Sequence, residues 1–514
     1  MQKISRRSLA IGIALLSIPS FVFIWLNRDI PHFGIIEDDG LYLIGAKTIA
    51  EGAPYRILSL PGEPYQSKYP PAYPLYLAIA WKAGSTLASR MALALILNWL
   101  CLPAAMILFH LWLRRHGFNE KESWLLTALF GLNPYILFFT SNLISEISFI
   151  AVLLAMIHVA ERRHAAAAGA LGGLAYLLRT AGIAILPAAI LYYLWVRRPR
   201  KAAWFTAGML PAILGWTLWS RAHTPPGHDV PTLYYTNYFA YQLYNVGLDN
   251  VHLVVWQNVS LTLESFGSFV FPQMIQGLPA KMILQPIGLA MILGCVRMFR
   301  RQPSLYATFG LTSTAVLLIW HGTPNQRLVL PLAPLLLAGF WTEAVHFWGL
   351  VRKALNHPDR SQRVVAYGFT GFVGLIIATG LALQIYMWAN VIPGMARDDR
   401  ANARAYASVY RWIEANTPVD ANILWEVDTA LYFATGRHSL ELLIPPREWY
   451  ATGNDRDIEH FRKIDEYARE NKLSYVVLPN IGPHRNPDYL AAVKDNRNLE
   501  QVHEEAGGVV YKLR

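Results

Sequence analysis

The feature that most constrains this chain is a series of long apolar runs separated by short clusters of arginine and lysine. A transmembrane helix needs about 20 consecutive, mostly apolar residues. Of the 514 residues, 54% are hydrophobic and only 15% are charged, whereas soluble domains carry roughly 25% charged residues. The sequence therefore predicts a mainly α, polytopic membrane protein.

The pattern predicts about eleven transmembrane helices. The predicted spans cover residues 9–26, 86–113, 123–139, 143–160, 165–178, 182–196, 202–219, 282–299, 305–320, 328–350 and 364–390. The runs 165–178 and 182–196 are short for full spans. A tight hairpin with Arg179 near its tip keeps the charge alternation consistent, whereas one long helix would invert every later loop.

Charge asymmetry predicts the orientation. The basic clusters fall on the side of the N-terminus, and those loops carry roughly twice as many lysines and arginines as the opposite loops. The first run follows Lys3, Arg6 and Arg7 and shows no small-residue cleavage site, so we expect an uncleaved span. The N-terminus should lie in the cytoplasm, and the first loop and the C-terminus should lie outside.

Composition excludes several classes of partner. The net charge of +11 is spread over short clusters between apolar runs, which sets membrane orientation and does not form a nucleic-acid patch. The two cysteines, Cys101 and Cys295, lie inside apolar runs and have no metal-ligand spacing. No internal repeat is visible, which counts mildly against a transporter of duplicated halves.

The composition changes near residue 397. We expect residues 1–396 to form the transmembrane domain, with 27–85 as its first outer loop, and 397–514 to form a small α/β domain outside the membrane. The predicted helices cover 400–415 and 457–470, and the predicted strands cover 422–427, 473–478, 499–503 and 508–513. No Gly-rich loop joins a strand to a helix, which argues against a nucleotide site.

The first outer loop carries the most polar motif beside the membrane. It opens with Glu37-Asp38-Asp39-Gly40 and ends in Lys68-Tyr69-Pro70-Pro71. The apolar segment 73–83 is too short to span and should lie along the interface. The three carboxylates form either a solvated loop or the acid/base centre of an enzyme that works at the bilayer surface.

Further ionisable residues fall on the same predicted face. Such residues at or within spans are costly and mark functional sites by default, although each one alone suits a helix cap or a headgroup contact. The set comprises Asp38, Asp39, Arg56, Lys68, Glu146, Arg179, His321 and Arg327. The tyrosine-rich segment 221–280 is better read as an interfacial belt than as a surface for sugar or lipid.

Cations and carboxylates on one membrane face suit group transfer from a lipid phosphate. Arginine grips phosphate with parallel hydrogen bonds, and a carboxylate can accept the proton of an attacking hydroxyl. Cations also stabilise a leaving phosphate as its charge grows. A base and a leaving group on opposite faces of one carbon imply a single displacement with inversion.

With these motifs the chain resembles the membrane-embedded GT-C glycosyltransferases, and among them the bacterial relatives of protein O-mannosyltransferases, of the ArnT and RgtA types. The resemblance covers nearly the whole chain in order. The matching motifs are Asp38-Asp39 with Tyr42, Pro54-Tyr55-Arg56, Lys68-Tyr69-Pro70-Pro71, Ala88-Ser89-Arg90, Ser145-Glu146, Gly172-Gly173 leading to Arg179-Thr180, Arg327 through Pro331, and Tyr432 through Arg437.

The resemblance implies roles for individual residues. Asp38 is the implied catalytic base, and Asp39, where the family often has Glu, orients the acceptor or a metal. Arg179, Arg327 and Lys68 are implied contacts of the donor phosphate. Tyr42, Arg56, Glu146 and His321 are further site candidates. The metal-binding residues of some family members have no match here, so a divalent metal stays an open question.

The implied function is inverting transfer of a hexose or pentose from a polyprenyl-phosphate donor. The acceptor would be a hydroxyl of a glycan, glycolipid or protein at the outer face of the cytoplasmic membrane. One alternative is a transporter or flippase of a lipid-linked saccharide, which would not consume the donor. Another is an oligosaccharide polymerase or ligase, which should use a lipid diphosphate.

Overall fold

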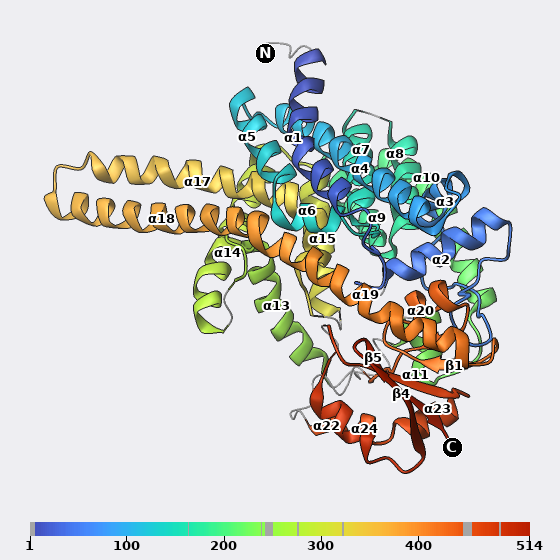
Figure 1. Cartoon of the computed structure of the whole chain (residues 1–514). Helices are drawn as coiled ribbons and strands as arrows, with labels where there is room; N and C mark the ends of the chain where they lie inside the picture. Colours follow the sequence, from blue (N-terminus) through green and yellow to red (C-terminus); the bar gives the residue numbers. More distant parts are fainter. Residues whose placement is uncertain are drawn as a thin grey trace.

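The computed structural model describes residues 6–36, 38–162, 164–237, 239–241, 250–274, 277–320, 323–445, 455–482 and 485–514. Helices dominate up to residue 416, and a five-stranded sheet follows (Figure 1). The chain begins at the far end of the bundle from the sheet, in which it ends. This order confirms the predicted combination of a mainly helical membrane protein with a small C-terminal α/β part.

The predicted apolar runs are helical. They correspond to α1 (Arg6–Leu26), α4 (Leu87–Arg115), α5 (Glu120–Gly131) with α6 (Pro134–Thr140), α7 (Glu146–Glu161), α8 (Ala165–Leu178), α9 (Ile185–Trp195), α10 (Pro199–His223), α14 (Leu278–Arg301), α15 (Leu305–Ile319), α17 (Ala333–Leu355) and α18 (Arg360–Tyr386). Leu26 and Leu15 on α1, both at least 60% exposed, illustrate the outward apolar surface that a bilayer covers.

Length and composition identify fewer certain spans than the sequence pattern predicts. Within the described residues, five helices are long and apolar enough to cross a membrane. The α5–α6 pair, bent by 52°, would make a sixth. The protein is therefore a multi-pass membrane protein, and the number of about eleven stays a prediction.

The predicted break at Arg179 is confirmed. Helix α8 ends at Leu178, and Arg179 is extended, with φ −150° and ψ 129°. A short 3-10 turn, η1 (Thr180–Ala184), then leads into α9. Any Cβ on Gly182 would lie 2.9 Å from the backbone of Tyr176, so the close return of the chain requires glycine. One continuous helix over this region is excluded.

The first loop contains more helix than its polar sequence indicated. Helix α2 (Asp38–Glu51) starts at the aspartate pair and packs against α3 (Ala72–Ala83). Helix α3 confirms the predicted short apolar segment. Residues 54–66 form a turn closed by an antiparallel bridge between Arg56 and Tyr65. The loop is thus an ordered layer beside the bundle, built around α2.

The sheet confirms the predicted strands and adds one. Its order is β2-β1-β3-β5-β4. Strands β2, β1 and β3 are parallel to one another, and β5 is antiparallel to both of its neighbours, β3 and β4. The strands are β1 (Asn422–Leu424), β2 (His438–Leu440), β3 (Tyr475–Pro479), β4 (Leu499–Glu505) and β5 (Gly508–Leu513). The added strand, β2, is three residues long and was too short for an alternation signal.

Helices also surround the sheet and the outer loops. They are α11 (Val230–Thr236), α13 (Val251–Gly267), α16 (Gln326–Val329), α19 (Ile392–Asn416), α20 (Asp428–Thr435), α22 (Asp455–Arg462), α23 (Ile464–Glu470) and α24 (Pro487–Lys494). A π-helical turn, η4 (Met387–Val391), joins α18 to α19. One long helical path therefore runs from the α17–α18 hairpin to the sheet (Figure 1).

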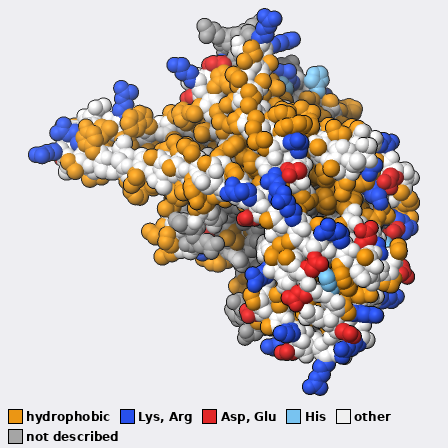
Figure 2. Space-filling view, in the orientation of Figure 1, with side chains coloured by type: hydrophobic (Ala, Val, Ile, Leu, Met, Phe, Trp, Pro, Cys, Tyr) orange, Lys and Arg blue, Asp and Glu red, His pale blue; other side chains and the backbone are white. Residues whose placement is uncertain are grey.

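Surface chemistry separates the two parts of the molecule. Hydrophobic side chains cover the bundle and the projecting α17–α18 hairpin, whereas charged side chains of both signs gather over the sheet end (Figure 2). Basic residues end α17, including Arg352 and Lys353, and Arg360 begins α18. This is the distribution expected of a membrane-embedded bundle with a water-exposed domain.

Candidate active site

Asp39 shapes the start of α2. Its carboxylate accepts hydrogen bonds from the backbone N–H groups of Gly34 (2.6 Å), Ile35 (3.1 Å), Ile36 (3.0 Å) and Gly40 (2.6 Å). The side chain is fully buried. Burial raises the pKa of Asp39 to about 6, against the lowering effect of these four N–H groups. Since both oxygens bind backbone, this geometry favours fixing the loop over contacting an acceptor or a metal.

Asp38, one residue earlier, points into a polar cluster. It accepts hydrogen bonds from the Tyr69 hydroxyl and from the Arg327 guanidinium. Its side chain is 20% exposed, so it stays accessible. Burial alone would raise the pKa of Asp38, but the charges of Arg327 and Lys68 and these hydrogen bonds hold it below its usual value. Asp38 is therefore ionised at neutral pH.

Glu146 joins two arginines. It begins α7, where a carboxylate meets the positive end of the helix dipole. Its Oε1 accepts hydrogen bonds from both Arg179 and Arg327. Its Oε2 is buried without a hydrogen-bond partner in the described part of the chain. Arg327 thus links Asp38 of the first loop to Glu146 of the bundle.

Local structure places the two arginines. Arg179 stands at the break between α8 and η1. Arg327 lies in the first turn of α16, which is capped by the Asn325 side chain through the N–H of Leu328 (3.2 Å). Both positions are helix ends, which the backbone leaves open to side-chain contacts.

Aromatic rings line the same region. The rings of Tyr69 and Tyr73 each lie 5.0 Å from the ring of Tyr42. The Tyr42 hydroxyl is 3.2 Å from the Ser145 hydroxyl. The ammonium of Lys68 lies 3.9 Å from the ring centre of Tyr234 and 4.9 Å from that of Tyr69. These contacts hold Lys68 beside Asp38, whose pKa it lowers.

The structure thus brings together five of the nine residues singled out from sequence, and it adds Tyr69. We call Asp38, Lys68, Tyr69, Glu146, Arg179 and Arg327 the Asp38 cluster; Tyr42 borders it, and Asp39 supports it. Arg56 lies elsewhere in the loop, where it donates to the Glu63 carbonyl (3.2 Å) and covers the Tyr65 ring. His321 lies outside the described residues, as does Glu37.

Sequence reasoning missed two aromatic members of the site. Tyr69 was part of the Lys68-Tyr69-Pro70-Pro71 motif, yet nothing in the motif showed that its hydroxyl would reach Asp38. Tyr234 belonged to the tyrosine-rich segment that we assigned to an interfacial belt, and it is buried against Lys68. Only the proximity of these segments in space identifies both side chains.

The C-terminal part packs against the first outer loop, which carries Asp38 and Lys68. Lys47 of α2 donates to the Tyr432 hydroxyl of α20 (3.0 Å). The Phe33 and Phe433 rings meet edge to face at 5.2 Å. A Cβ on Gly40 would lie 1.9 Å from the Thr429 Oγ1, so α20 packs directly on the first turn of α2.

The cluster does not fit a metal site. Among the described residues, no group of three or more His, Cys, Asp and Glu could hold a metal ion. The Asp39 oxygens bind backbone N–H groups, and Asp38 and Glu146 face arginines. Two carboxylates stand against three cations, so the cluster is suited to an anion.

No protein-family model matches the chain, and no curated protein matches its sequence. Solved structures do match it. ArnT from Cupriavidus metallidurans bound to undecaprenyl phosphate is 14% identical, with a TM-score of 0.54 over 99% of this chain and 98% of that one.

A second solved structure extends the likeness. The Archaeoglobus fulgidus oligosaccharyltransferase tethered with an acceptor peptide is 13% identical, with a TM-score of 0.54 over 93% of this chain and 69% of that one. At these identities the likeness establishes the architecture. The chain therefore has the fold of the GT-C membrane glycosyltransferases.

Proposed function

We propose that this protein is an inverting glycosyltransferase that moves a hexose or pentose from a polyprenyl-phosphate donor to a hydroxyl acceptor. The acceptor is a glycan, glycolipid or protein at the outer face of the cytoplasmic membrane. One observation carries the proposal. Asp38 from the first loop, Glu146 from α7, Arg179 from the hairpin and Arg327 from α16 meet in one ion-pair network.

The charge of the Asp38 cluster supports a monophosphate donor. The carboxylates of Asp38 and Glu146 face the cations Lys68, Arg179 and Arg327, which leaves one net positive charge. A sugar joined to a lipid through one phosphate carries one negative charge, whereas a diphosphate carries two. The balance therefore favours the monophosphate over the donor of a polymerase or ligase.

The same groups supply a reaction in one displacement. The ionised Asp38 carboxylate accepts the proton of the acceptor hydroxyl. The acceptor oxygen bonds to the anomeric carbon as the bond from that carbon to the phosphate oxygen breaks. The polyprenyl phosphate leaves with the electron pair, and Arg327, Arg179 and Lys68 stabilise its charge. Attack opposite the leaving group inverts the anomeric carbon.

Neighbouring residues position these groups. Asp39 fixes Gly34, Ile35, Ile36 and Gly40 through hydrogen bonds to their backbone N–H groups and so positions Asp38. Glu146 accepts hydrogen bonds from both Arg179 and Arg327 and so fixes the spacing of the two guanidinium groups. In this assignment residues 1–396 form the catalytic domain, and residues 397–514 form an outer domain that covers the loop and contacts the acceptor.

ArnT supports the donor class, because the matching structure holds undecaprenyl phosphate. The oligosaccharyltransferase structure carries an acceptor peptide, in keeping with an acceptor outside the lipid. A flippase would gain nothing from a buried carboxylate–arginine network that a hydroxyl could reach at Asp38. The charge distribution predicts a cytoplasmic N-terminus and an outer C-terminus.

Purified protein in lipid nanodiscs should release polyprenyl phosphate from a panel of polyprenyl-phosphate hexoses and pentoses, with membrane glycolipid as the acceptor. Asp38→Asn should lower turnover by about 10²–10⁴-fold because the general base is lost. Glu51→Gln, on the exposed end of the same helix, is the matched control and should retain turnover. Equal thermal unfolding of the variants shows that folding is intact.

Two outcomes would overturn the proposal. Turnover of Asp38→Asn at the wild-type rate would remove the base assignment. Preferential consumption of a polyprenyl-diphosphate saccharide would assign the protein to polymerases or ligases. Mass analysis of envelope glycans from a deletion strain carrying wild type or Asp38→Asn identifies the sugar, as a difference of one residue mass.

A further inference from the structure

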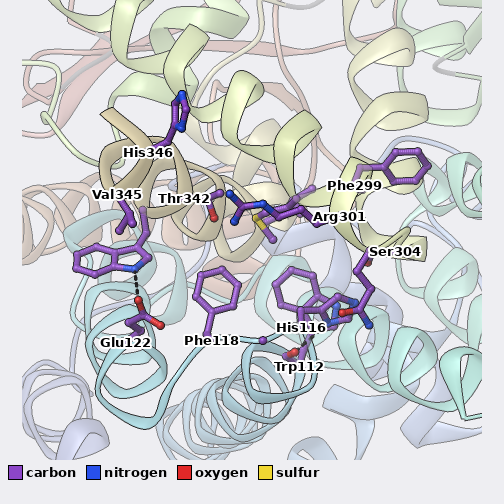
Figure 3. Close-up of a pocket in the computed structure, with 16 residues that line it drawn as sticks. Trp112, His116, Phe118, Glu122, Phe299, Arg301, Ser304, Thr342, Val345 and His346 are labelled. Carbon is purple, nitrogen blue, oxygen red and sulfur yellow. Dashed lines mark hydrogen bonds between the residues drawn. The ribbon is translucent and has the colours of Figure 1, made fainter. Parts of the chain in front are cut away.

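We propose that a pocket at the other end of the bundle binds the phosphate head group of an anionic phospholipid. The cavity measures about 280 Å³ and lies among the ends of α4, α5, α14 and α15 and the first half of α17 (Figure 3). We call it the Arg301 pocket. Helix α15 runs from Ser304 at the pocket toward the short helix α16 that carries Arg327, a rise of about 22 Å.

The pocket presents a guanidinium, an imidazole and an indole N–H whose hydrogen-bond partners do not come from the described protein. In Figure 3 the Arg301 side chain extends across the cavity toward Thr342, and His346 lies above it. Neither the Arg301 side chain nor the His346 side chain forms a hydrogen bond or ion pair with the part of the chain that is described. The Trp112 indole N–H is also without a hydrogen-bond partner there, although Trp112 is only 1% exposed.

A buried donor without a partner is costly unless a ligand or water accepts its hydrogen bond. The neighbouring arginines show the contrast. Arg114 pairs with Glu120 (3.5 Å), Arg115 with Glu161 (3.6 Å) and Arg297 with Glu343 (3.0 Å). Arg301, which alone of these four lines the cavity, is exposed and has no such acid, so the cost of burial falls on the Trp112 N–H.

The carboxylate in the pocket wall already accepts hydrogen bonds from the protein. Glu122 accepts hydrogen bonds from the Trp341 indole (3.1 Å) and from the backbone N–H of Asn119 (2.8 Å). Figure 3 shows the Trp341 bond as a dashed line beside Glu122. The groups left to a ligand are therefore hydrogen-bond donors and a guanidinium, which matches a phosphate.

The remaining lining is apolar and adjoins the bilayer. Phe118, Met298, Leu335 and Val345 lie around the cavity, and Val345 is 51% exposed. Three of the wall helices, α4, α14 and α17, belong to segments apolar and long enough to span a membrane. A ligand with a phosphate and attached acyl chains fits both the hydrogen-bond donors and the apolar lining of the pocket. Basic pockets between transmembrane helices are typical head-group sites.

The test uses the purified full-length protein and its thermal unfolding in detergent. Phosphatidylglycerol added at rising concentration should raise the midpoint temperature, whereas phosphatidylcholine should raise it much less. Arg301→Gln should weaken the apparent affinity for phosphatidylglycerol by about tenfold, the loss of one charge-assisted hydrogen bond. Arg300→Gln removes the neighbouring exposed arginine, which does not line the pocket, and should retain the wild-type affinity.

Other variants and probes keep the test decisive. Val345→Trp fills the mouth without changing charge and should also weaken the protection. Native mass spectrometry should show one phosphatidylglycerol retained at clearly higher occupancy by wild type than by Arg301→Gln. Equal retention in Arg301→Gln and Arg300→Gln would overturn the site. Full protection by inorganic phosphate alone would replace the lipid with a soluble phosphate ligand. None of these readouts depends on glycosyl transfer.

Discussion

The two ends of the helix bundle differ in whether their arginines are paired with acids. In the Asp38 cluster, the arginines contact carboxylates from distant segments, as Arg327 does with Asp38 and Glu146. In the Arg301 pocket, an arginine and a buried indole N–H have no acceptor in the described chain. Paired charges are ordered before a substrate arrives, which suits catalysis. Unpaired donors suit retention of an anionic ligand.

The largest effect that would break this comparison is on turnover. Arg327→Gln should lower the rate of transfer by about 10²–10³-fold, because a preorganised cation at the leaving group is lost. Arg300→Gln removes a cation from the other end and should stay within about twofold of wild type. The measurement is polyprenyl phosphate released under saturating donor. Equal losses of turnover in the two variants would show that the loss does not depend on the contact of Arg327 with the Asp38 cluster.

A middle-sized effect tests the packing of α20, in the outer domain, against α2 at the Asp38 end of the bundle. Gly40→Ala places a methyl group against Thr429 and should destabilise the protein by about 1–3 kcal/mol. Thr429→Ala in the same chain removes the nearest atom and should restore part of the loss. Thermal unfolding of both variants measures this. If Gly40→Ala unfolds at the wild-type temperature, the contact between α20 and α2 does not stabilise the protein.

The smallest effect concerns pH and distinguishes the two neighbouring aspartates. Asp38 must be ionised to act as a base, and its pKa lies below the usual 3.8. The kcat/KM of transfer should therefore show no acidic decline from this group above about pH 5. A decline centred near pH 6 would match Asp39, whose pKa burial raises to about 6, and would transfer the essential role to it.

Much of the fold was predictable because apolar run length and charge alternation act locally. The apolar runs became helices, and the break at Arg179 was placed correctly from the two short runs around it. Helix α2 was missed because its start depends on the Asp39 carboxylate binding Gly34 and its neighbours. Strand β2 was missed because its pairing with β1, and not a period in its sequence, defines it.

For the candidate site, the sequence indicated which residues share one membrane face, including Asp38, Glu146, Arg179 and Arg327. Only the family resemblance distinguished Asp38, as the implied base, from Asp39, since the two are adjacent and chemically identical. The helix start buries one carboxylate among backbone N–H groups and leaves the other facing Arg327. Arg56 shows the converse, because it shares the face yet packs on Tyr65.

The sequence by itself determined that the chain is a multi-pass membrane protein with a C-terminal α/β part, because hydrophobic length and charge sidedness are properties of single segments. Tertiary structure decided which charges meet. Arg327 lies 289 residues beyond Asp38, and no local pattern fixes a contact over that separation. The same holds for the Arg301 pocket, where five helices leave a cavity that no single segment contains.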